Sequence, residues 1–597
     1  ARIEVMPLAG TEFAADTRGG AILITLRRRR DGGMDGNLQF STVQSNRIAG
    51  YTPSGRIGIR TGRWTLTASG SGSFTPVAES RFTETREQAG QPLPFAGRSD
   101  SKSRTNYGRG HFSAVFDPTP KHTAGFDIEY TERSTHMPTL SRTTLGQTQS
   151  DSRYRQHMDG NTLTATANYI WKIDTLGSQF KLIADYTRYT SDGDNSYHTT
   201  TCAPGTLRDS LYESATGSVY DILTADAGLT RKLPHGLTLR AGLRYTRNDM
   251  ADKSRYAAQT QGTWLALPEY SYDQHYTEQI GAAYASLEYS AGRWELSAGL
   301  RGEYTSVASQ AFGRSYFGLF PNVSVSRALN ALRTWLLVAQ WSRNIERPAF
   351  PALNPARIRI SDYSWQSGNP SLRPTYIHRF SLTAVWKYRY TLTVGGNLHH
   401  DLIREIAHRD ATAPDAVYIR PENHYTENHW FVAASVPAKI TRWWNLSVNA
   451  VGVMQRIRLN STDSPATHYL MFADATCSFT LPAGFFAEAV YRAQSRLYSG
   501  NSEVGPRHTL SATVKKQLFG KRLTLFCTLS NITGCDWEFA SLTDGMRRTI
   551  DTGQAWSGRL WKVGAAWNFR TGKKFRARTV ESAAETQRKR LVKSTEQ

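Results

Sequence analysis

The sequence has no uninterrupted apolar run of about 18 residues, which is the length that a membrane-spanning helix needs. Its hydrophobic content is only 39%, which is low for a 597-residue chain with a large buried core. These features exclude transmembrane helices. They do not exclude a membrane β-barrel, because strands that alternate in polarity never look hydrophobic as a whole.

Cysteine is also scarce, and the beginning of the chain shows no leader. Cys202, Cys477, Cys527 and Cys535 form neither a disulfide framework nor a metal-ligand spacing. The first ten residues lack the charged and apolar regions of a signal peptide. We therefore expect the chain to start after processing or partway into a longer protein.

The charge is strongly positive, at a formal net value of +22. Such an excess raises nucleic acid or an anionic membrane surface as a partner. Lys and Arg are nevertheless scattered through the chain, and no helix-turn-helix, zinc-finger or RNA-recognition motif accompanies them. We therefore expect no nucleic-acid partner.

Apolar and polar residues alternate along most of the chain from Gly36 onward. Leu237, Leu239 and Leu243, for example, fall on one face of a segment that carries Arg240 and Arg244 on the other. Many of these segments have ten residues or more, which suits a tilted strand that crosses a bilayer. A charged second face suits a water-filled lumen. The pattern predicts transmembrane strands with lipid outside and water inside.

Tight turns alternate with long polar connections. The turns are near 117–121, 173–177, 233–236, 290–293, 481–484 and 519–521, and the long connections are near 76–105, 134–157, 192–213, 250–274, 344–374 and 533–556. This asymmetry is typical of outer-membrane barrels, whose short turns are periplasmic. The predicted fold class is all-β, a transmembrane antiparallel β-barrel of about 22 strands, and a barrel of that size is expected to be plugged.

The proline-rich stretch 344–374 interrupts the pattern, and strand parity places it outside the cell. We expect neither strand nor helix in it, because its prolines remove backbone donors and fix φ; they are Pro348, Pro351, Pro355, Pro370 and Pro374. Residues between these prolines are candidates for ligand contact: Arg357, Arg359, Asp362, Tyr363 and Trp365.

Three stretches carry a resemblance to a known family. Residues 3–30 (IEVMPLAGTEFAADTRGGAILITLRRRR) look like the end of a plug domain, NIERPAFPALNP and GNPSLRP within 344–374 look like an arginine-proline and GNP-x-L-x-P signature, and NFRTGKKFRARTVESAAETQRKRL looks like the family's C-terminus. The chain thus resembles the TonB-dependent transporter and receptor superfamily, specifically the outer-membrane β-barrel receptors common in the Bacteroidetes. The resemblance implies the end of a plug at 1–30, with most of the plug missing, a barrel at 31–570 and a basic periplasmic tail at 571–597.

The resemblance also implies a function. In intact relatives ligand binds at the extracellular loops and plug apex, the TonB system pulls on the plug, and neither enzymatic activity nor a cofactor is needed. The implied protein is a receptor/transporter in the outer membrane of a Gram-negative bacterium, importing a specific ligand with TonB-coupled energy when intact. The implied partners are outer-membrane lipid, TonB through the missing N-terminal region, a surface lipoprotein, and a small-molecule or oligomeric substrate. The alternatives are a structural or adhesive barrel and a passive porin lacking a functional plug.

Charged residues on the predicted inner face are candidates for binding a ligand or holding a plug: Lys181, Asp185, Arg240, Arg244, Arg301, Glu303, Asp474, Glu488 and Arg492. No metal site is predicted. His399 and His400 are adjacent, so they point to opposite faces of a strand. His424 and His429 lie near a predicted loop and are expected to be solvated.

Overall fold

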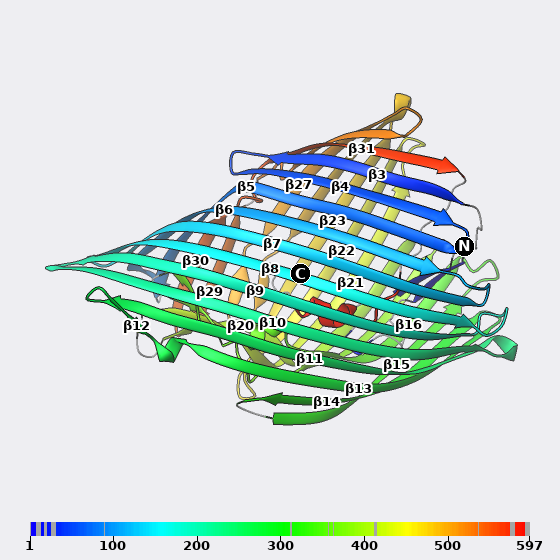
Figure 1. Ribbon diagram of the computed structural model, residues 1–597, viewed down its shortest axis with the longest axis horizontal. Helices are drawn as coiled ribbons and strands as arrows, with labels where there is room; N and C mark the ends of the chain where they lie inside the picture. Colours follow the sequence, from blue (N-terminus) through cyan, green and yellow to red (C-terminus); the bar gives the residue numbers. More distant parts are fainter. Residues whose placement is uncertain are drawn as a thin grey trace.

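Twenty-two long strands close into a barrel in this computed structural model (Figure 1), which describes residues 2–6, 14–16, 21–25, 32–88, 90–310, 313–355, 357–361, 363–410, 413, 415–534, 536–572 and 580–591. Among these residues each wall strand is antiparallel to its neighbours, and β3 pairs with β31 to close the wall. The wall consists of β3 (Gly33–Gln44), β4 (Ile48–Thr61), β5 (Trp64–Gln88), β6 (Gln91–Phe116), β7 (His122–Leu145), β8 (Thr148–Lys172), β9 (Gln179–Ala203), β10 (Thr206–Lys232), β11 (Leu237–Thr260), β13 (Tyr272–Ala291), β14 (Trp294–Ser309), β15 (Gly313–Ala328), β16 (Trp335–Glu346), β19 (Thr375–Trp386), β20 (Tyr390–Arg409), β21 (Val417–Lys439), β22 (Trp444–Arg458), β23 (Ala466–Thr480), β24 (Phe485–Gln494), β27 (Arg507–Leu518), β28 (Leu523–Ser530) and β31 (Leu560–Gly572). The predicted fold class and strand number are confirmed.

Shorter elements lie at the ends of the barrel or inside it. They are β1 (Arg2–Met6), β2 (Ala21–Thr25), β12 (Thr263–Ala266), β17 (Ile358–Ser361), β18 (Ser364–Gln366), β25 (Leu497–Ser499), β26 (Ser502–Val504), β29 (Trp537–Thr543), β30 (Met546–Gly553), and the helices α1 (Phe350–Leu353) and α2 (Glu585–Lys589). β1 and β2 pair with each other in a separate two-stranded sheet. No helix in the described part of the chain has both the length and the apolarity to cross a membrane.

The two faces of the wall differ as the alternation predicts. On β9, Leu182 and Tyr186 point outward and are exposed, whereas Ile183, Asp185 and Thr187 alternate with them and are buried on the inner side. Successive side chains of a strand point to opposite faces, so an apolar outer row and a polar inner row follow from the sequence. This arrangement lets the outer face contact lipid while the polar face lines the lumen.

The tight turns are where the sequence places them, but the long connections differ from the prediction. Residues 76–105 and 134–157 were expected to be loops, and they instead continue the wall strands as β5–β6 and β7–β8 hairpins. Above the bilayer both faces of a strand meet water or other loops, so no apolar row is required to keep the backbone paired. Residues 192–213 and 250–260 extend β9, β10 and β11 in the same way (Figure 1).

The stretch 344–374 is also more regular than predicted, so the expectation of neither strand nor helix was wrong. Its prolines fall at the boundaries of the elements: Pro351 is in the first turn of α1, where a missing N–H costs nothing, and β17 and β18 pair between Pro355 and Pro370. A close approach fixes the return of the chain, since a Cβ on Gly368 would lie 2.0 Å from the carbonyl oxygen of Asn354.

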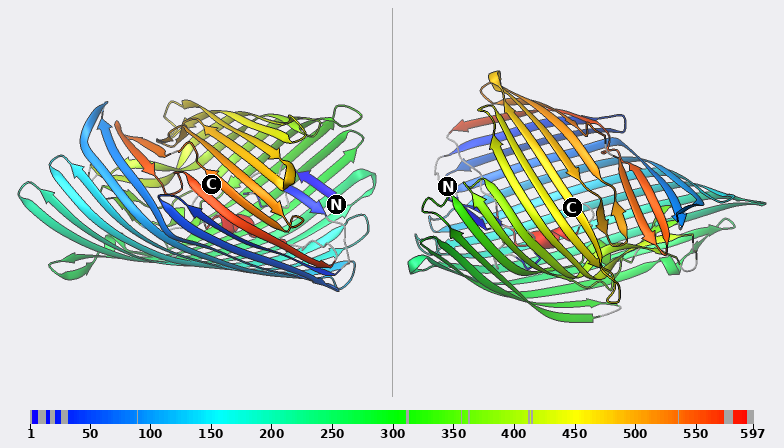
Figure 2. Two further views of the ribbon diagram at one scale, coloured as in Figure 1. Left: turned by 90° about the horizontal axis from the view of Figure 1, so that it is seen from above. Right: turned by 180° about the vertical axis from the view of Figure 1, so that it is seen from behind.

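This stretch folds back into the barrel. Phe350 and Leu353 of α1 pack with Tyr220, Met250 and Tyr276 of the inner wall in a buried apolar cluster. Residues 580–591, part of the segment expected to be a periplasmic tail, lie beside it within the ring of strands, where Figure 2 shows α2 enclosed in both views. The wall therefore surrounds segments from distant parts of the chain.

Candidate functional site

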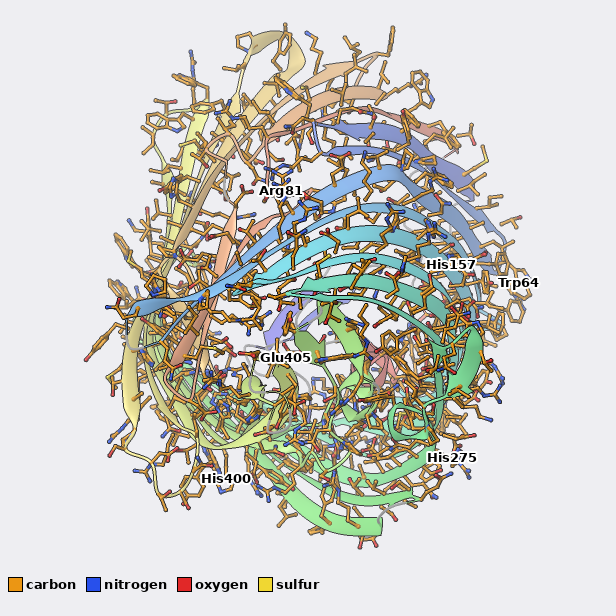
Figure 3. All side chains as sticks on the ribbon, turned by 90° about the vertical axis from the view of Figure 1, so that its left-hand side faces the viewer. Trp64, Arg81, His157, His275, His400 and Glu405 are labelled. Carbon is orange, nitrogen blue, oxygen red and sulfur yellow. The ribbon has the colours of Figure 1, made fainter. Side chains whose placement is uncertain are left out.

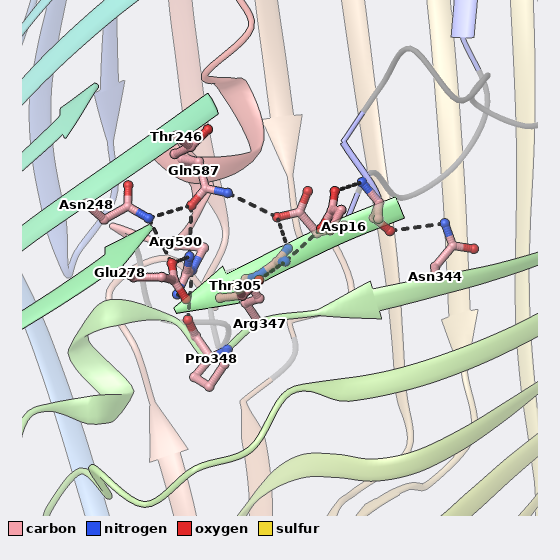
Figure 4. Close-up of polar contacts among 12 residues, drawn as sticks. Asp16, Thr246, Asn248, Glu278, Thr305, Asn344, Arg347, Pro348, Gln587 and Arg590 are labelled. Atoms are coloured by element: carbon pink, nitrogen blue, oxygen red, sulfur yellow. Dashed lines mark hydrogen bonds and ion pairs between the residues drawn. The ribbon is translucent and has the colours of Figure 1, made fainter. Parts of the chain in front are cut away.

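A buried polar network in the lumen joins four parts of the chain (Figure 4). Its members come from residues 14–16, from the inner wall, from the stretch 344–374 and from residues 580–591. We call residues 14–16 the N-terminal segment and residues 580–591 the C-terminal segment. They are Ala15, Asp16, Asn248, Glu278, Arg301, Glu303, Thr305, Asn344, Arg347, Pro348, Gln587 and Arg590. We call this set the lumen network.

Arg347 is the centre of one half of the lumen network. Its Nη2 donates to Glu303 Oε2 at 2.7 Å and to Thr305 Oγ1 at 3.1 Å, and Asp16 lies 3.9 Å from the guanidinium. Glu303 also accepts from Arg301 Nε at 2.6 Å. Burial alone would lower the pKa of Arg347, but the nearby carboxylates, Glu303 above all, raise it well above its usual value. The guanidinium therefore stays charged in the lumen.

The N-terminal segment is held at the same place. The backbone N–H of Ala15 donates to Glu303 Oε1 at 3.3 Å, and its carbonyl accepts from Asn344 Nδ2 at 3.2 Å. The backbone N–H of Ile345 donates to that carbonyl too, also at 3.2 Å. The end of β16 and the chain near Ala15 are thus bonded to each other and to one carboxylate of β14.

Arg590 is the centre of the other half. Its guanidinium pairs with Glu278 of β13, donates from Nε to the carbonyl of Pro348 at 3.0 Å, and lies 4.2 Å from the ring centroid of Phe350. The backbone N–H of Phe350 donates to the Arg590 carbonyl at 2.8 Å. One side chain therefore fastens the C-terminal segment to both the wall and the stretch 344–374.

Gln587 connects the two halves. Its Oε1 accepts from Asn248 Nδ2 at 3.2 Å and from Arg590 Nη1 at 2.8 Å, while its Nε2 lies 3.5 Å from Asp16 Oδ2. Gln587, Glu278 and Asn248 are all buried. Because buried charges are costly unless they are paired, displacing any one segment would leave charges of the others unsatisfied.

Four of the predicted inner-face residues hold these internal segments. Lys181 pairs with Glu581 at 2.6 Å, Asp185 accepts from the backbone N–H of Ala583 at 2.7 Å, and Arg301 and Glu303 belong to the lumen network. Arg240 and Arg244 instead pair with wall carboxylates, those of Glu288 and Asp226. The remaining three lie on the opposite wall: Asp474, Glu488 and Arg492.

That opposite wall is less covered. Asp474 faces Arg492 across β23 and β24 and accepts from Asn449 Nδ2 at 2.9 Å; Asp474 and Glu488 are half-buried and Arg492 is exposed. Arg301 and Glu303, in contrast, are each 2% exposed. The N-terminal and C-terminal segments therefore pack against β7 to β16, and the stretch 344–374 also contacts β5, β6, β20 and β21. The side chains of β23 and β24 stay accessible to water.

The predicted loop residues form part of the packing above the lumen network. Arg359 lies 5.4 to 5.7 Å from the ring centroids of Trp365, Tyr212 and Tyr154, and Arg357 lies 5.2 Å from that of Tyr270. These arrangements are cation–π contacts, and those to Tyr154 and Tyr212 join the stretch 344–374 to the inner wall. The contact to Tyr270 joins the stretch to the connection between β12 and β13.

Tyr363 and Asp362 complete the predicted loop set. The Tyr363 ring contacts Phe95 edge-on at 5.9 Å, and its carbonyl accepts from Arg86 Nη2 at 3.4 Å. Asp362 lies outside the described residues. As ligand contacts, these loop residues stay a prediction.

The histidines expected to be solvated lie in β21 and are partly or fully buried. Glu427, which is fully buried, accepts from His429 Nε2 at 2.8 Å, from Gln455 Nε2 at 2.8 Å and from Arg404 Nη2 at 3.0 Å, with His424 beside it. In the described residues, no three His, Cys, Asp or Glu side chains converge in a metal-binding arrangement. The cluster fastens the inner wall to residue 498, whose carbonyl accepts from Gln455.

Sequence reasoning missed most of the lumen network. Arg347 stands in the NIERP stretch and was interpreted only as part of an arginine-proline signature, and Arg590 stands in a segment expected to be a basic periplasmic tail. An arginine directly before a proline at the end of a strand was the one available signal. Glu278 and Arg590 are 312 positions apart, so no local pattern indicates their pairing.

Comparisons with known proteins agree with this architecture. The siderophore receptor PirA from Pseudomonas aeruginosa is 13% identical, with 95% of this chain and 86% of that chain covered at a TM-score of 0.57. A mutant of the ferric enterobactin receptor PfeA from Pseudomonas aeruginosa, in complex with enterobactin, is 15% identical over 95% and 86% at 0.59, and the copper transporter OprC is 12% identical over 93% and 85% at 0.58. At these identities the likeness concerns the fold. No match is found among curated proteins.

The sequence profile of the outer membrane protein beta-barrel family matches residues 171–564, which is well over half of the chain. This region begins near the end of β8 and includes the wall strands from β9 to β28. The match, the closed wall and the apolar outer face agree on one location, the outer membrane of a Gram-negative bacterium. The chain belongs to the outer membrane protein beta-barrel family.

Proposed function

We propose that the protein is a gated outer-membrane receptor that imports a specific ligand, with TonB-coupled energy in the intact protein. The observation that carries the proposal is the lumen network. It fastens three chain segments inside a 22-strand wall with buried ion pairs, and an open pore needs no such contacts. Internal segments held by polar bonds can be released by a modest force or by a ligand, since these bonds can be exchanged for bonds to water.

The path that we propose runs along β23 and β24. The side chains of Asp474, Glu488 and Arg492 are the accessible charges on that wall, whereas those of Arg301 and Glu303 are covered by the internal segments. The mixed signs along this wall suit a ligand with several polar groups rather than a highly charged one. Arg357, Arg359, Tyr363 and Trp365 at the extracellular end are the proposed points of first contact.

The solved structures of similar fold supply the ligands to try first. They are a siderophore receptor, a ferric enterobactin receptor and a copper transporter. For this chain we propose metal complexes of that kind as the first candidates. A surface lipoprotein remains a proposed partner, and residues 1–30 are proposed to be the end of a plug.

Uptake of labelled complexes tests the proposal. The gene with its natural upstream region is expressed in a Gram-negative strain that lacks its own siderophore receptors, and uptake of iron-loaded siderophores and of copper is measured with and without TonB. We expect uptake of at least one complex that disappears without TonB. Uptake of small sugars and ions at the same rate in both strains would show a passive porin, and surface binding without any uptake would show an adhesive barrel.

A further inference from the structure

A groove lies on the outer side of the barrel wall, well above the lipid-facing band. On β9 the exposed apolar residues Leu182 and Tyr186 mark this band, and Asp194 in the groove is eight positions beyond Tyr186. At about 3.3 Å per residue and a tilt of about 45°, that distance is roughly 19 Å along the membrane normal. The groove is therefore at the height of the sugar layer of the outer leaflet.

The strand register builds the groove from two rows of side chains across β8, β9, β10 and β11. The first row is Arg155, Ser196, Glu213 and Ala257. The second row is His157, Asp194, Ala215 and Arg255. The residues that alternate with them, such as Tyr154 and Tyr256, are buried on the inner side, so both rows face outward.

Short side chains leave the groove open, and β12 closes one end. Ser196, Ala215 and Ala257 form its floor, and Trp264 and Pro268 stand at the end, giving a groove of about 880 Å³. The Trp264 side chain is 40% exposed. Figure 3 shows His157 on the same outer side of the wall as Trp64, away from the interior in which Glu405 lies.

Each row carries one positive and one negative side chain, and their order from β8 to β11 is reversed between the rows: arginine comes first in the first row and aspartate in the second. Arg155 and Glu213 are two strands apart in the first row, as are Asp194 and Arg255 in the second, which separates each pair by roughly 9.6 Å. Within the described part of the chain, none of the four takes part in an ion pair with another residue. Their donors and acceptors are thus available to a ligand.

This chemistry fits a saccharide. Hydroxyl groups both donate and accept, so they can bond guanidinium groups and carboxylates side by side, and the exposed indole offers an apolar face to a sugar ring. Two arginines and two carboxylates balance in charge, so the groove suits the neutral sugars of such a chain better than its anionic groups.

We propose that this outer-wall groove binds the oligosaccharide of the lipopolysaccharide that surrounds the barrel. The groove opens sideways, toward neighbouring lipids, rather than into the lumen, so a sugar chain rooted in the same membrane reaches it directly. A transported ligand that enters through the mouth does not pass it. The site is therefore separate from the proposed import path.

The test uses the full chain in phospholipid nanodiscs and isothermal titration calorimetry. The probes are the core oligosaccharide released from lipopolysaccharide by mild acid hydrolysis and, as a free sugar unrelated to it, maltoheptaose. The variants are Trp264→Ala, which removes the indole, and Ala215→Trp, which fills the groove from an exposed position without touching the core. Arg153→Ala, an exposed arginine on the same face that does not line the groove, is the matched control.

We expect the core oligosaccharide to bind, with affinity reduced at least ~10-fold by either groove substitution and unchanged by Arg153→Ala. Absence of binding by both probes, or unchanged binding to Ala215→Trp, would overturn the proposal. Binding of maltoheptaose alone would overturn the assignment to lipopolysaccharide, because the groove would then serve free glycans.

Discussion

The substitution Arg590→Met removes the side chain that joins the C-terminal segment to both the wall and the stretch 344–374. Arg590 pairs with Glu278, donates to Gln587 and Pro348, and stacks over Phe350, while Glu278 is 2% exposed. Methionine keeps much of the length of the stem but, among the residues that the structure describes, leaves the Glu278 carboxylate with a single side-chain donor, that of Asn248 at 2.8 Å. A buried charge left in this state must either become solvated or be protonated.

Breaking a buried ion pair on one side costs about 3–5 kcal/mol. Since a factor of ten is about 1.4 kcal/mol, docking of the C-terminal segment should weaken by about 100- to 5,000-fold. The remaining attachments of this segment are few, among them the Lys181–Glu581 pair and the bond from Ala583 to Asp185. We therefore expect the C-terminal segment to leave the wall in a substantial fraction of Arg590→Met molecules.

Hydrogen exchange of residues 580–591, measured by mass spectrometry in nanodiscs, reports this release. Lys589→Met is the matched control, because Lys589 makes only an exposed pair with Glu585, which is worth about 0.5 kcal/mol or less. The double variant Glu278→Gln with Arg590→Met should recover part of the protection, since no unpaired charge remains. Equal protection in the wild type and in Arg590→Met would refute the reasoning.

Three further predictions concern other parts of the molecule. Arg347→Met should release the N-terminal segment and speed exchange at residues 14–16, while Arg333→Met, which removes an exposed arginine in the turn before β16, should not; equal exchange in both would contradict the role of Arg347. Gly368→Ala should disturb the stretch 344–374, because the new Cβ would meet the Asn354 carbonyl at 2.0 Å, whereas Gly452→Ala meets nothing within 4 Å; trypsin cleavage near Arg357 and Arg359 distinguishes them, and equal cleavage rates would count against the close approach. Val394→Arg on the lipid face should destabilise the barrel by about 2–4 kcal/mol in vesicle unfolding, and Thr393→Arg on the lumen face by far less; similar losses at both positions would refute the assignment of the faces.

The sequence predicted the wall well because the wall is a local pattern. In an alternating segment such as that of Leu237, Leu239 and Leu243, the face on which a residue lies follows from its position along the strand alone. Tight turns such as 481–484 end strands by local backbone geometry. The extensions of β5 to β11 were missed because polar residues on both faces resemble a loop in sequence. Paired backbones are equally stable there when neighbouring strands extend together.

The interior was harder to predict for a physical reason. The C-terminal segment is basic and has no apolar stripe, so its sequence indicates a solvated helix. The lumen is favourable for Arg590 because distant parts of the chain supply the Glu278 carboxylate and the Pro348 carbonyl. The predicted charges Lys181, Asp185, Arg301 and Glu303 were recognised as inner-face groups with the right chemistry, that of holding a polar body to the wall. What they hold includes a piece of the same chain, which alternation cannot reveal.

Conductance in planar bilayers tests most directly the claim that internal segments occupy the lumen and obstruct it. The full chain is compared with a chain truncated after Thr579 and with Arg590→Met and Lys589→Met. The account predicts larger single-channel steps for the truncated chain, intermittent steps of similar size for Arg590→Met, and wild-type behaviour for Lys589→Met. The same conductance in all four proteins would contradict it.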